Sequence, residues 1–222
     1  MRIHPIALEA AAEITKGFAS NTLEGRAADA GASLPWLASM VAAAGPGDHV
    51  DIGSLFGASA ITAALVKKKL KLDGLVYCID PFLPRQLVAM PPGMDPKIFE
   101  GNPEALMRNA EKAGVELKLI QKSSDPWPDE LKDLVFASAY IDGSHIDGMP
   151  KKDFLNLRGL VTSYIGWDNY DESYADVLNA ANFSFSNECP DWSLYYKNFT
   201  FLAVRRSIDS LFRNVPGHNL IS

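Results

Sequence analysis

The sequence has few cysteines and no long hydrophobic run. Cys78 and Cys189 are the only two cysteines among 222 residues, and neither belongs to a CxxC pair, so neither a disulfide framework nor a thiolate metal site is indicated. A reducing compartment fits this usage, and we expect a cytoplasmic protein. Glu9 and Glu13 interrupt the apolar stretch near the N-terminus, and no run reaches 18 apolar residues. We therefore expect no export signal and no membrane partner.

The chain also lacks an excess of positive charge. It has 21 Lys and Arg against 27 Asp and Glu, which gives a net charge of −6. Because phosphate backbones attract basic surfaces, nucleic acid is not expected as a partner. The length of 222 residues and the hydrophobic share of 47% are ordinary for a single domain with a sizeable core. Within that domain we expect a helical segment at residues 1–45, followed by an α/β region at 46–222.

From residue 49 onward, apolar runs alternate with helical patterns. Such alternation is typical of a parallel sheet covered on both faces by helices. Segments 183–186 and 199–206 are both strand-like without a long helix between them, which predicts an antiparallel pair at one sheet edge. The predicted fold is an α/β three-layer sandwich with a mostly parallel, seven-stranded sheet and an antiparallel edge. The parallel strands are expected at 49–53, 75–80, 117–121, 136–142 and 161–168, and the helices at 59–69, 103–113, 128–134, 150–157 and 173–181.

Two glycines lie in the turn between the first predicted strand and the next helix, in the stretch DIGSLFGAS at residues 51–59. Because Gly53 and Gly57 have no Cβ, the backbone can turn tightly and approach a ligand at the helix N-terminus. The spacing G-x-x-x-G, with Asp51 two residues before it, differs from the G-x-G-x-x-G of dinucleotide-binding enzymes and disfavours an NAD-type oxidoreductase. A tight strand-to-helix turn without a ligand is the other interpretation.

The second predicted strand ends at Asp80. In an open α/β sheet this position presents a carboxylate to a ribose in the crevice beyond the strand ends, and one Asp can accept two hydroxyl hydrogen bonds. A turn residue before Pro81 is the alternative. Taken together with the glycine loop, Asp80 favours a nucleoside-containing ligand. The proline-rich stretch 81–96 that follows is long enough to be a lid or a binding loop.

Three motifs resemble class I S-adenosylmethionine-dependent methyltransferases. They are the glycine loop at 51–59, the acid that closes YCID at 77–80, and YIDGSH at 140–145, which is similar to the IDGxH motif of macrocin-type O-methyltransferases. The resemblance covers about residues 20–206. It implies a Rossmann-like methyltransferase sheet that binds S-adenosylmethionine in the region 46–222, with 1–45 as a lid on the substrate side. It implies that Gly53 and Gly57 line the methionine part of the cofactor, that Asp80 holds its ribose, and that Ser124 and Asp125 lie near the adenine. Asp51, Ser54 and Ser59 of the same loop are also expected to bind the cofactor.

Oxygen-bearing side chains end two further strands. Asp142 ends the fourth predicted strand, and Asp168 and Asn169 end the fifth. Adjacent parallel strands bring such residues side by side, and oxygen donors suit a hard cation such as Mg²⁺ or another divalent ion. The arrangement is similar to the metal ligands of catechol and caffeoyl-CoA O-methyltransferases. Macrocin-like relatives generally have two acids at the second position, so Asn169 leaves a sugar and a phenol both open as acceptor. Strand-end caps and turn formers are the alternative.

The resemblance implies that Asp142 takes part in catalysis and that His145, three residues later, is the general base. Imidazole is well suited to accept a hydroxyl proton near neutral pH. Lys151 or Lys152 is the alternative base, because catechol-type relatives use a lysine after the fourth strand. A surface or supporting histidine is the plain interpretation of His145.

These residues together predict an S-adenosylmethionine-dependent O-methyltransferase. The resemblance implies a small-molecule hydroxyl acceptor, such as a sugar, a phenol or a natural product, and dependence on Mg²⁺. A metal-independent methyltransferase and a non-catalytic S-adenosylmethionine-binding protein of the same fold are the alternatives. The N-terminal helices are candidate surfaces for a homodimer.

Overall fold

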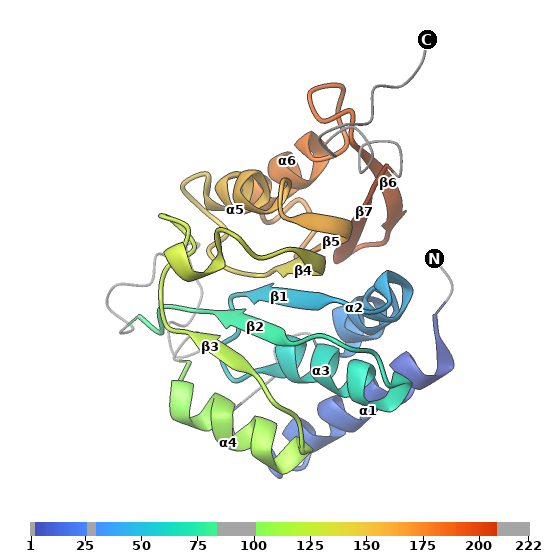
Figure 1. Ribbon diagram of the computed structural model, residues 1–222, viewed down its shortest axis with the longest axis vertical. Coiled ribbons are helices and arrows are strands. Elements are labelled where there is room, and N and C mark those ends of the chain that lie inside the picture. Colours follow the sequence, from blue (N-terminus) through green and yellow to red (C-terminus); the bar gives the residue numbers. More distant parts are fainter. Residues whose placement is uncertain (1–2, 26–29, 84–100, 208–222) are drawn as a thin grey trace.

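The computed structural model contains one mixed sheet with helices on both faces (Figure 1). It describes residues 3–25, 30–83 and 101–207. The strands lie in the order β3-β2-β1-β4-β5-β7-β6, which confirms the seven-stranded sheet expected from the sequence. The strands are β1 Asp48–Ile52, β2 Val76–Ile79, β3 Lys118–Ile120, β4 Phe136–Ile141, β5 Val161–Asp168, β6 Trp192–Lys197 and β7 Phe201–Arg206.

The strand order reverses between β1 and β4. Strands β1 to β5 are parallel to one another, whereas β7 is antiparallel to both β5 and β6. Ligands of open α/β sheets bind beyond the strand ends at such a reversal. The Gly53 N–H donates to the carbonyl of Ile79 at 2.9 Å, and the Asp142 N–H donates to the carbonyl of Ile52 at 2.9 Å. The chain segments that leave the carboxyl ends of β1 and β4 are thus hydrogen-bonded to the ends of the neighbouring strands.

Two layers of helices cover the sheet. One apolar core joins α1, α2, α3 and α4 to one face, and a second joins α5 and α6 to the other (Figure 1). Successive strand residues point to opposite faces, so in β2 the side chain of Cys78 enters the first core and that of Ile79 the second. This is the predicted three-layer sandwich. The helices are α1 Pro5–Ala19, α2 Ala30–Ala44, α3 Ala58–Leu70, α4 Pro103–Ala113, α5 Met149–Leu157 and α6 Ala175–Phe183.

The N-terminal helices belong to the first core. Ala7 and Leu37 are fully buried and Ile14 is 2% exposed, because α1 and α2 both pack on α3. Both α1 and α2 lie within the segment 1–45, and the use of this segment as a lid stays a prediction. None of the helices within the described ranges is long and apolar enough to cross a membrane.

Two predicted elements are wrong. The segment 183–186 is not a strand, because α6 extends to Phe183 and a turn follows; Phe183 and Phe185 pack against the second core instead, and β6 begins at Trp192. The helix predicted at 128–134 shrinks to a 3₁₀ turn, Asp129–Leu131, in which only Leu131 is buried. Most of the predicted loop 81–96 lies outside the described residues.

Candidate functional site

The glycine loop passes directly against the turn after β4. Gly53 has φ +88°, and a Cβ on it would collide with the backbone carbonyl of Asp142. Gly57 has φ +91° at the N-cap of α3. Both conformations favour glycine, since other residues rarely adopt them. The loop predicted to contact a cofactor and the acid predicted to act in catalysis are therefore neighbours.

Asp51 lies beneath this loop. Its side chain is fully buried, and its Oδ2 accepts hydrogen bonds from Ser54 Oγ at 2.6 Å and Ser59 Oγ at 3.0 Å. Its Oδ1 has no hydrogen-bond partner among the described residues. Burial raises the pKa of the carboxyl to about 6, against the effect of the two serines. Ser54 and Ser59 use their hydroxyl protons in hydrogen bonds to Asp51, so only their lone pairs remain for a ligand.

Asp80 joins the loops that follow β1 and β2. Its Oδ2 accepts the N–H of Leu55 at 2.9 Å, and its Oδ1 accepts the N–H of Phe82 at 2.7 Å. The residue is 5% exposed, and burial raises its pKa despite these bonds. Asp80 therefore stabilises the turn that follows β2, which was the alternative interpretation of this residue. A backbone hydrogen bond from Ser54 also reaches this carboxylate. Because a carboxylate offers about four lone-pair sites, it can still accept from a ribose hydroxyl.

The segment after β3 is fastened to α5 by side chains that the sequence motifs did not reveal. Ser124 Oγ donates to Asp153 Oδ1 at 2.6 Å, and Asn156 Nδ2 donates to the carbonyl of Ser124 at 3.0 Å. Asp125 pairs with Lys152 at 2.7 Å on the surface. Asp153 is fully buried, and its Oδ2 has no hydrogen-bond partner within the described part of the chain. Burial raises its pKa to about 7.

Asp142 directly follows β4, and Asp168 is the last residue of the neighbouring strand β5. Ile141 pairs with Trp167, so the next residue of each strand falls side by side. The pKa of Asp168 is raised to about 7, first by burial and then by the charge of Asp142. Two carboxylates this close resist simultaneous ionisation unless a cation joins them.

The oxygen atoms of this pair fit a hard cation. Asp168 accepts hydrogen bonds from Ser33 and Tyr140, yet its buried Oδ1 has no hydrogen-bond partner among the described residues. The adjacent Asn169 is in the left-handed region with φ +52° and adds an amide oxygen of the kind that Mg²⁺ accepts. No group of three or more His, Cys, Asp or Glu suited to a metal occurs in the ranges that the structure describes, so the predicted metal set depends on Asn169.

His145 is the predicted base that lies beside Asp142. Its Nε2 is 3.4 Å from Asp142 Oδ1, and its side chain is 14% exposed. The ring meets Tyr174 edge-on, with centroids 5.0 Å apart. Burial lowers the pKa of the imidazole, although nearby carboxylates oppose this. A neutral imidazole is the form that can accept a proton.

The two alternative bases are engaged elsewhere on α5. The Lys152 ammonium pairs with Asp125, as described above, which raises its pKa. The Lys151 Nζ lies 3.9 Å from the centroid of the Phe183 ring. Of the three predicted bases, His145 is therefore the one beside Asp142.

The strand order, its reversal between β1 and β4 and the antiparallel β7 define an α/β Rossmann-like methyltransferase fold. A scan against protein-family models found no match, and neither did a search of curated proteins. Among solved structures, the O-methyltransferase from Bacillus cereus, in complex with S-adenosylhomocysteine, is 14% identical with a TM-score of 0.61, covering 90% of this chain and 91% of that chain.

Two further structures show how widely this fold is used. TomG from Streptomyces achromogenes, an O-methyltransferase of tomaymycin synthesis in complex with S-adenosylmethionine, is 15% identical with a TM-score of 0.56 over 90% of each chain. The branched-chain polyamine synthase from Thermus thermophilus, in complex with N4-aminopropylspermidine and 5′-methylthioadenosine, is 12% identical with a TM-score of 0.60, covering 91% of this chain and 66% of that chain. At such identities the likeness establishes the fold, and the chemistry must be argued from the site.

Proposed function

We propose that this protein is an S-adenosylmethionine-dependent O-methyltransferase acting on a hydroxyl group of a small molecule. The observation that carries the proposal is the contact between the glycine loop and the Asp142 turn, where Gly53 leaves no room for a Cβ. A sulfonium donor in the loop would lie next to His145 and Asp142. O-methyltransferases that bind S-adenosylmethionine or its product share the fold.

The cofactor would be held at three places along the sheet edge. Gly53 and Gly57 allow its methionine part to approach the backbone at the N-terminus of α3. Asp80 would accept a ribose hydroxyl through its remaining lone-pair capacity. Ser124 and Asp125, held by α5, would border the adenine.

A divalent cation such as Mg²⁺ would be held by Asp142, Asp168 and Asn169. The Oδ1 of Asp168, which has no hydrogen-bond partner among the described residues, and the mutual repulsion of the two carboxylates support this assignment. When bound, such a cation lowers the pKa of a coordinated hydroxyl group.

The chain's own residues would carry out the proton transfer. His145 accepts the acceptor's hydroxyl proton on its neutral imidazole, and Asp142 stabilises the resulting imidazolium. The freed oxygen lone pair attacks the sulfonium methyl group, the carbon–sulfur bond breaks with its electrons going to sulfur, and S-adenosylhomocysteine is the product. His145 then releases the proton to water. Alignment of donor and acceptor can contribute about 7–11 kcal/mol to such a reaction.

A metal-independent methyltransferase is the second candidate. The hydrogen bonds from Ser33 and Tyr140 to Asp168 favour it, because they already stabilise this acid without a cation. A chelator separates the two candidates, since only the metal-dependent enzyme loses turnover in EDTA.

The test is a binding measurement followed by product analysis. We expect S-adenosylhomocysteine to bind in calorimetry, and a panel of phenols, sugars and natural-product alcohols to yield a methyl ether together with S-adenosylhomocysteine. Release of 5′-methylthioadenosine instead would indicate transfer of a different alkyl group. Cofactor binding without any transfer across the panel would favour a non-catalytic binding protein, and no binding would overturn the proposal.

A further inference from the structure

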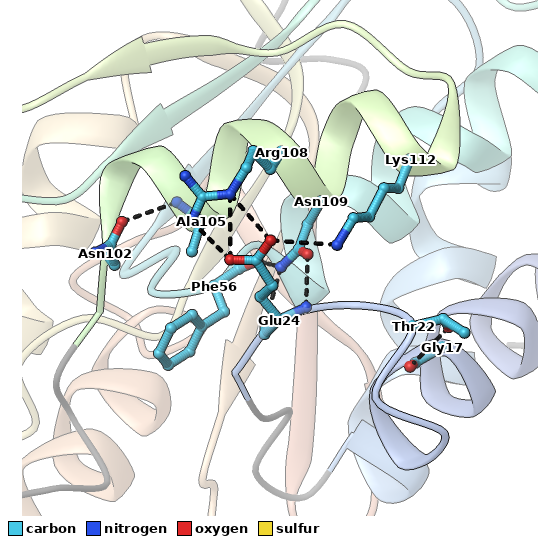
Figure 2. A network of polar contacts seen from close by, with 9 residues as sticks. All are labelled: Gly17, Thr22, Glu24, Phe56, Asn102, Ala105, Arg108, Asn109 and Lys112. Atoms are coloured by element: carbon cyan, nitrogen blue, oxygen red, sulfur yellow. Dashed lines mark hydrogen bonds and ion pairs between the residues drawn. The ribbon is translucent and has the colours of Figure 1, made fainter.

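A polar network outside the predicted site ties the N-terminal segment to α4 (Figure 2). The Glu24 carboxylate accepts three hydrogen bonds from the Arg108 guanidinium, at 2.9 and 3.2 Å from Nε and 2.6 Å from Nη2, and one from Lys112 Nζ at 3.2 Å. We call Glu24, Arg108, Lys112 and Asn109 the Glu24 clasp. These cations hold the pKa of Glu24 at about 2, so the clasp stays charged at neutral pH.

Asn109 connects the clasp to the glycine loop. Its Oδ1 accepts the Glu24 N–H at 2.7 Å, and its Nδ2 donates to the carbonyls of Glu24 and Phe56, each at 3.0 Å (Figure 2). The side chain is fully buried. Both amide protons and the carbonyl oxygen are thus used, which neither Asp nor Leu could reproduce. One side chain therefore fixes two backbone segments relative to each other.

The contact continues into the loop itself. Gly25 has φ +83°, and a Cβ on it would overlap the Phe56 ring, so the N-terminal segment lies closely against this ring. Phe56 stands between Gly53 and Gly57. The preceding Leu55 has φ +45°, which is unfavourable for a residue with a side chain. A loop with such a residue keeps its shape only when its surroundings hold it.

We propose that Glu24 and Asn109 are positioning residues of the cofactor site, which hold the Phe56 segment in the conformation that binds S-adenosylmethionine. The inference rests on the proposed function, because it concerns the same loop. The chain of contacts runs from Glu24 through Asn109 to Phe56, and from the neighbouring Leu55 to Asp80. A ligand's apparent affinity falls with the fraction of protein in the binding-competent state, so loosening the clasp weakens cofactor binding without touching the cofactor.

The test uses exposed residues, so the variants keep the buried core. Glu24→Gln and Arg108→Ala should each raise the dissociation constant of S-adenosylhomocysteine by roughly three- to tenfold, the factor to which about 0.7–1.4 kcal/mol corresponds. The double variant should bind no more weakly than the weaker-binding single variant, because both changes break the same link. Arg108→Lys keeps a cation and should recover part of the affinity.

The matched control is Glu13→Gln. Glu13 and Lys69 form another exposed ion pair, at 3.1 Å, between α1 and α3, but within the described part of the chain no side chain like Asn109 joins it to the loop. This variant should bind S-adenosylhomocysteine as the wild type does. The wild-type dissociation constant should also rise with salt more steeply than that of Glu24→Gln, because ions screen the exposed pair.

Hydrogen exchange in the cofactor-free protein gives a readout independent of binding. The N–H groups of Leu55 and Gly57 are hydrogen-bonded, to Asp80 and Ser54 respectively, and should exchange faster in Glu24→Gln than in wild type or Glu13→Gln. Unchanged exchange and unchanged affinity in both clasp variants would overturn the inference. An equal loss of affinity in Glu13→Gln would also overturn it. Faster exchange in a protein that binds no S-adenosylhomocysteine would support loop positioning while refuting the proposed function.

Discussion

The carboxylate of Asp80 accepts the N–H of Leu55 at 2.9 Å, so the acid that follows β2 is bonded to the glycine loop after β1. The bond ties a residue that would hold a ribose to a loop that would hold the methionine part. In the proposed function this bond holds two parts of the cofactor site in place relative to each other, which would reduce the ordering cost of binding.

Asp80→Ala should weaken the binding of S-adenosylhomocysteine at least about tenfold, because each hydrogen bond to a charged acceptor is worth about 1.5–3 kcal/mol. The Asp80→Asn variant keeps one acceptor oxygen, so its dissociation constant should fall between those of the wild type and Asp80→Ala. Calorimetry measures both constants. Asp129→Asn, at an exposed acid far along the chain, is the control, and equal affinity in Asp80→Ala and wild type would remove Asp80 from the ribose role.

Asp142→Asn and Asp168→Asn should abolish the binding of Mn²⁺, used as a paramagnetic substitute for Mg²⁺, because each removes a carboxylate from the proposed set. Electron paramagnetic resonance measures the free ion. In parallel, wild-type turnover should be lost in EDTA and return with added Mg²⁺. Full turnover in the presence of EDTA would exclude metal dependence and favour the metal-independent enzyme.

His145→Ala should lower kcat by about 10²–10⁴, the usual contribution of a general base. The dissociation constant of S-adenosylhomocysteine should stay near that of wild type, because the proposal gives His145 no contact with the cofactor. Lys151→Ala and Lys152→Ala are the comparisons, since their ammonium groups contact Phe183 and Asp125. A wild-type rate for His145→Ala, with a slow Lys variant, would transfer the role to that lysine.

Asp153 should make the protein less stable as the pH rises. Its pKa is raised from 3.8 to about 7 by burial, so the folded state favours the protonated acid. This contribution to stability is complete below pH 4 and is lost as the pH rises through 7. At 1.36 kcal/mol per pKa unit, it changes the free energy of unfolding by on the order of 2–3 kcal/mol between pH 5 and 8.

Urea unfolding at pH 5 and pH 8 measures this effect. Asp153→Asn cannot ionise, so its free energy of unfolding should fall less between the two pH values than that of the wild type. Parallel pH dependence in the two proteins would show that Asp153 does not titrate in this range. Ser124→Ala separates the hydrogen bond from the charge, because it removes the donor to Asp153 and should raise the pKa of the acid further.

The local sequence pattern was sufficient to predict the parallel strands. A buried strand followed by a glycine or an acid is visible in the sequence, and strands β1, β2, β4 and β5 appear within two residues of their predicted positions. The antiparallel edge was harder, because the short segment 183–186 alternates like a strand but continues from a helix. Packing determines the conformation of this segment, because Phe183 and Phe185 pack against the second apolar core.

The residue pattern alone places Gly53, Asp80, Asp142 and Asp168 at strand ends, and in a parallel sheet all carboxyl ends lie on the same side. The side-chain partners around these strand ends, in contrast, follow from the packing of the whole chain. Asn109 bonds to Glu24 across 85 positions of the chain, and Asp153 to Ser124 across 29. Such contacts have no local sequence pattern, because they form when whole helices pack on the sheet. Polar groups that become buried there then need hydrogen-bond partners from distant parts of the chain.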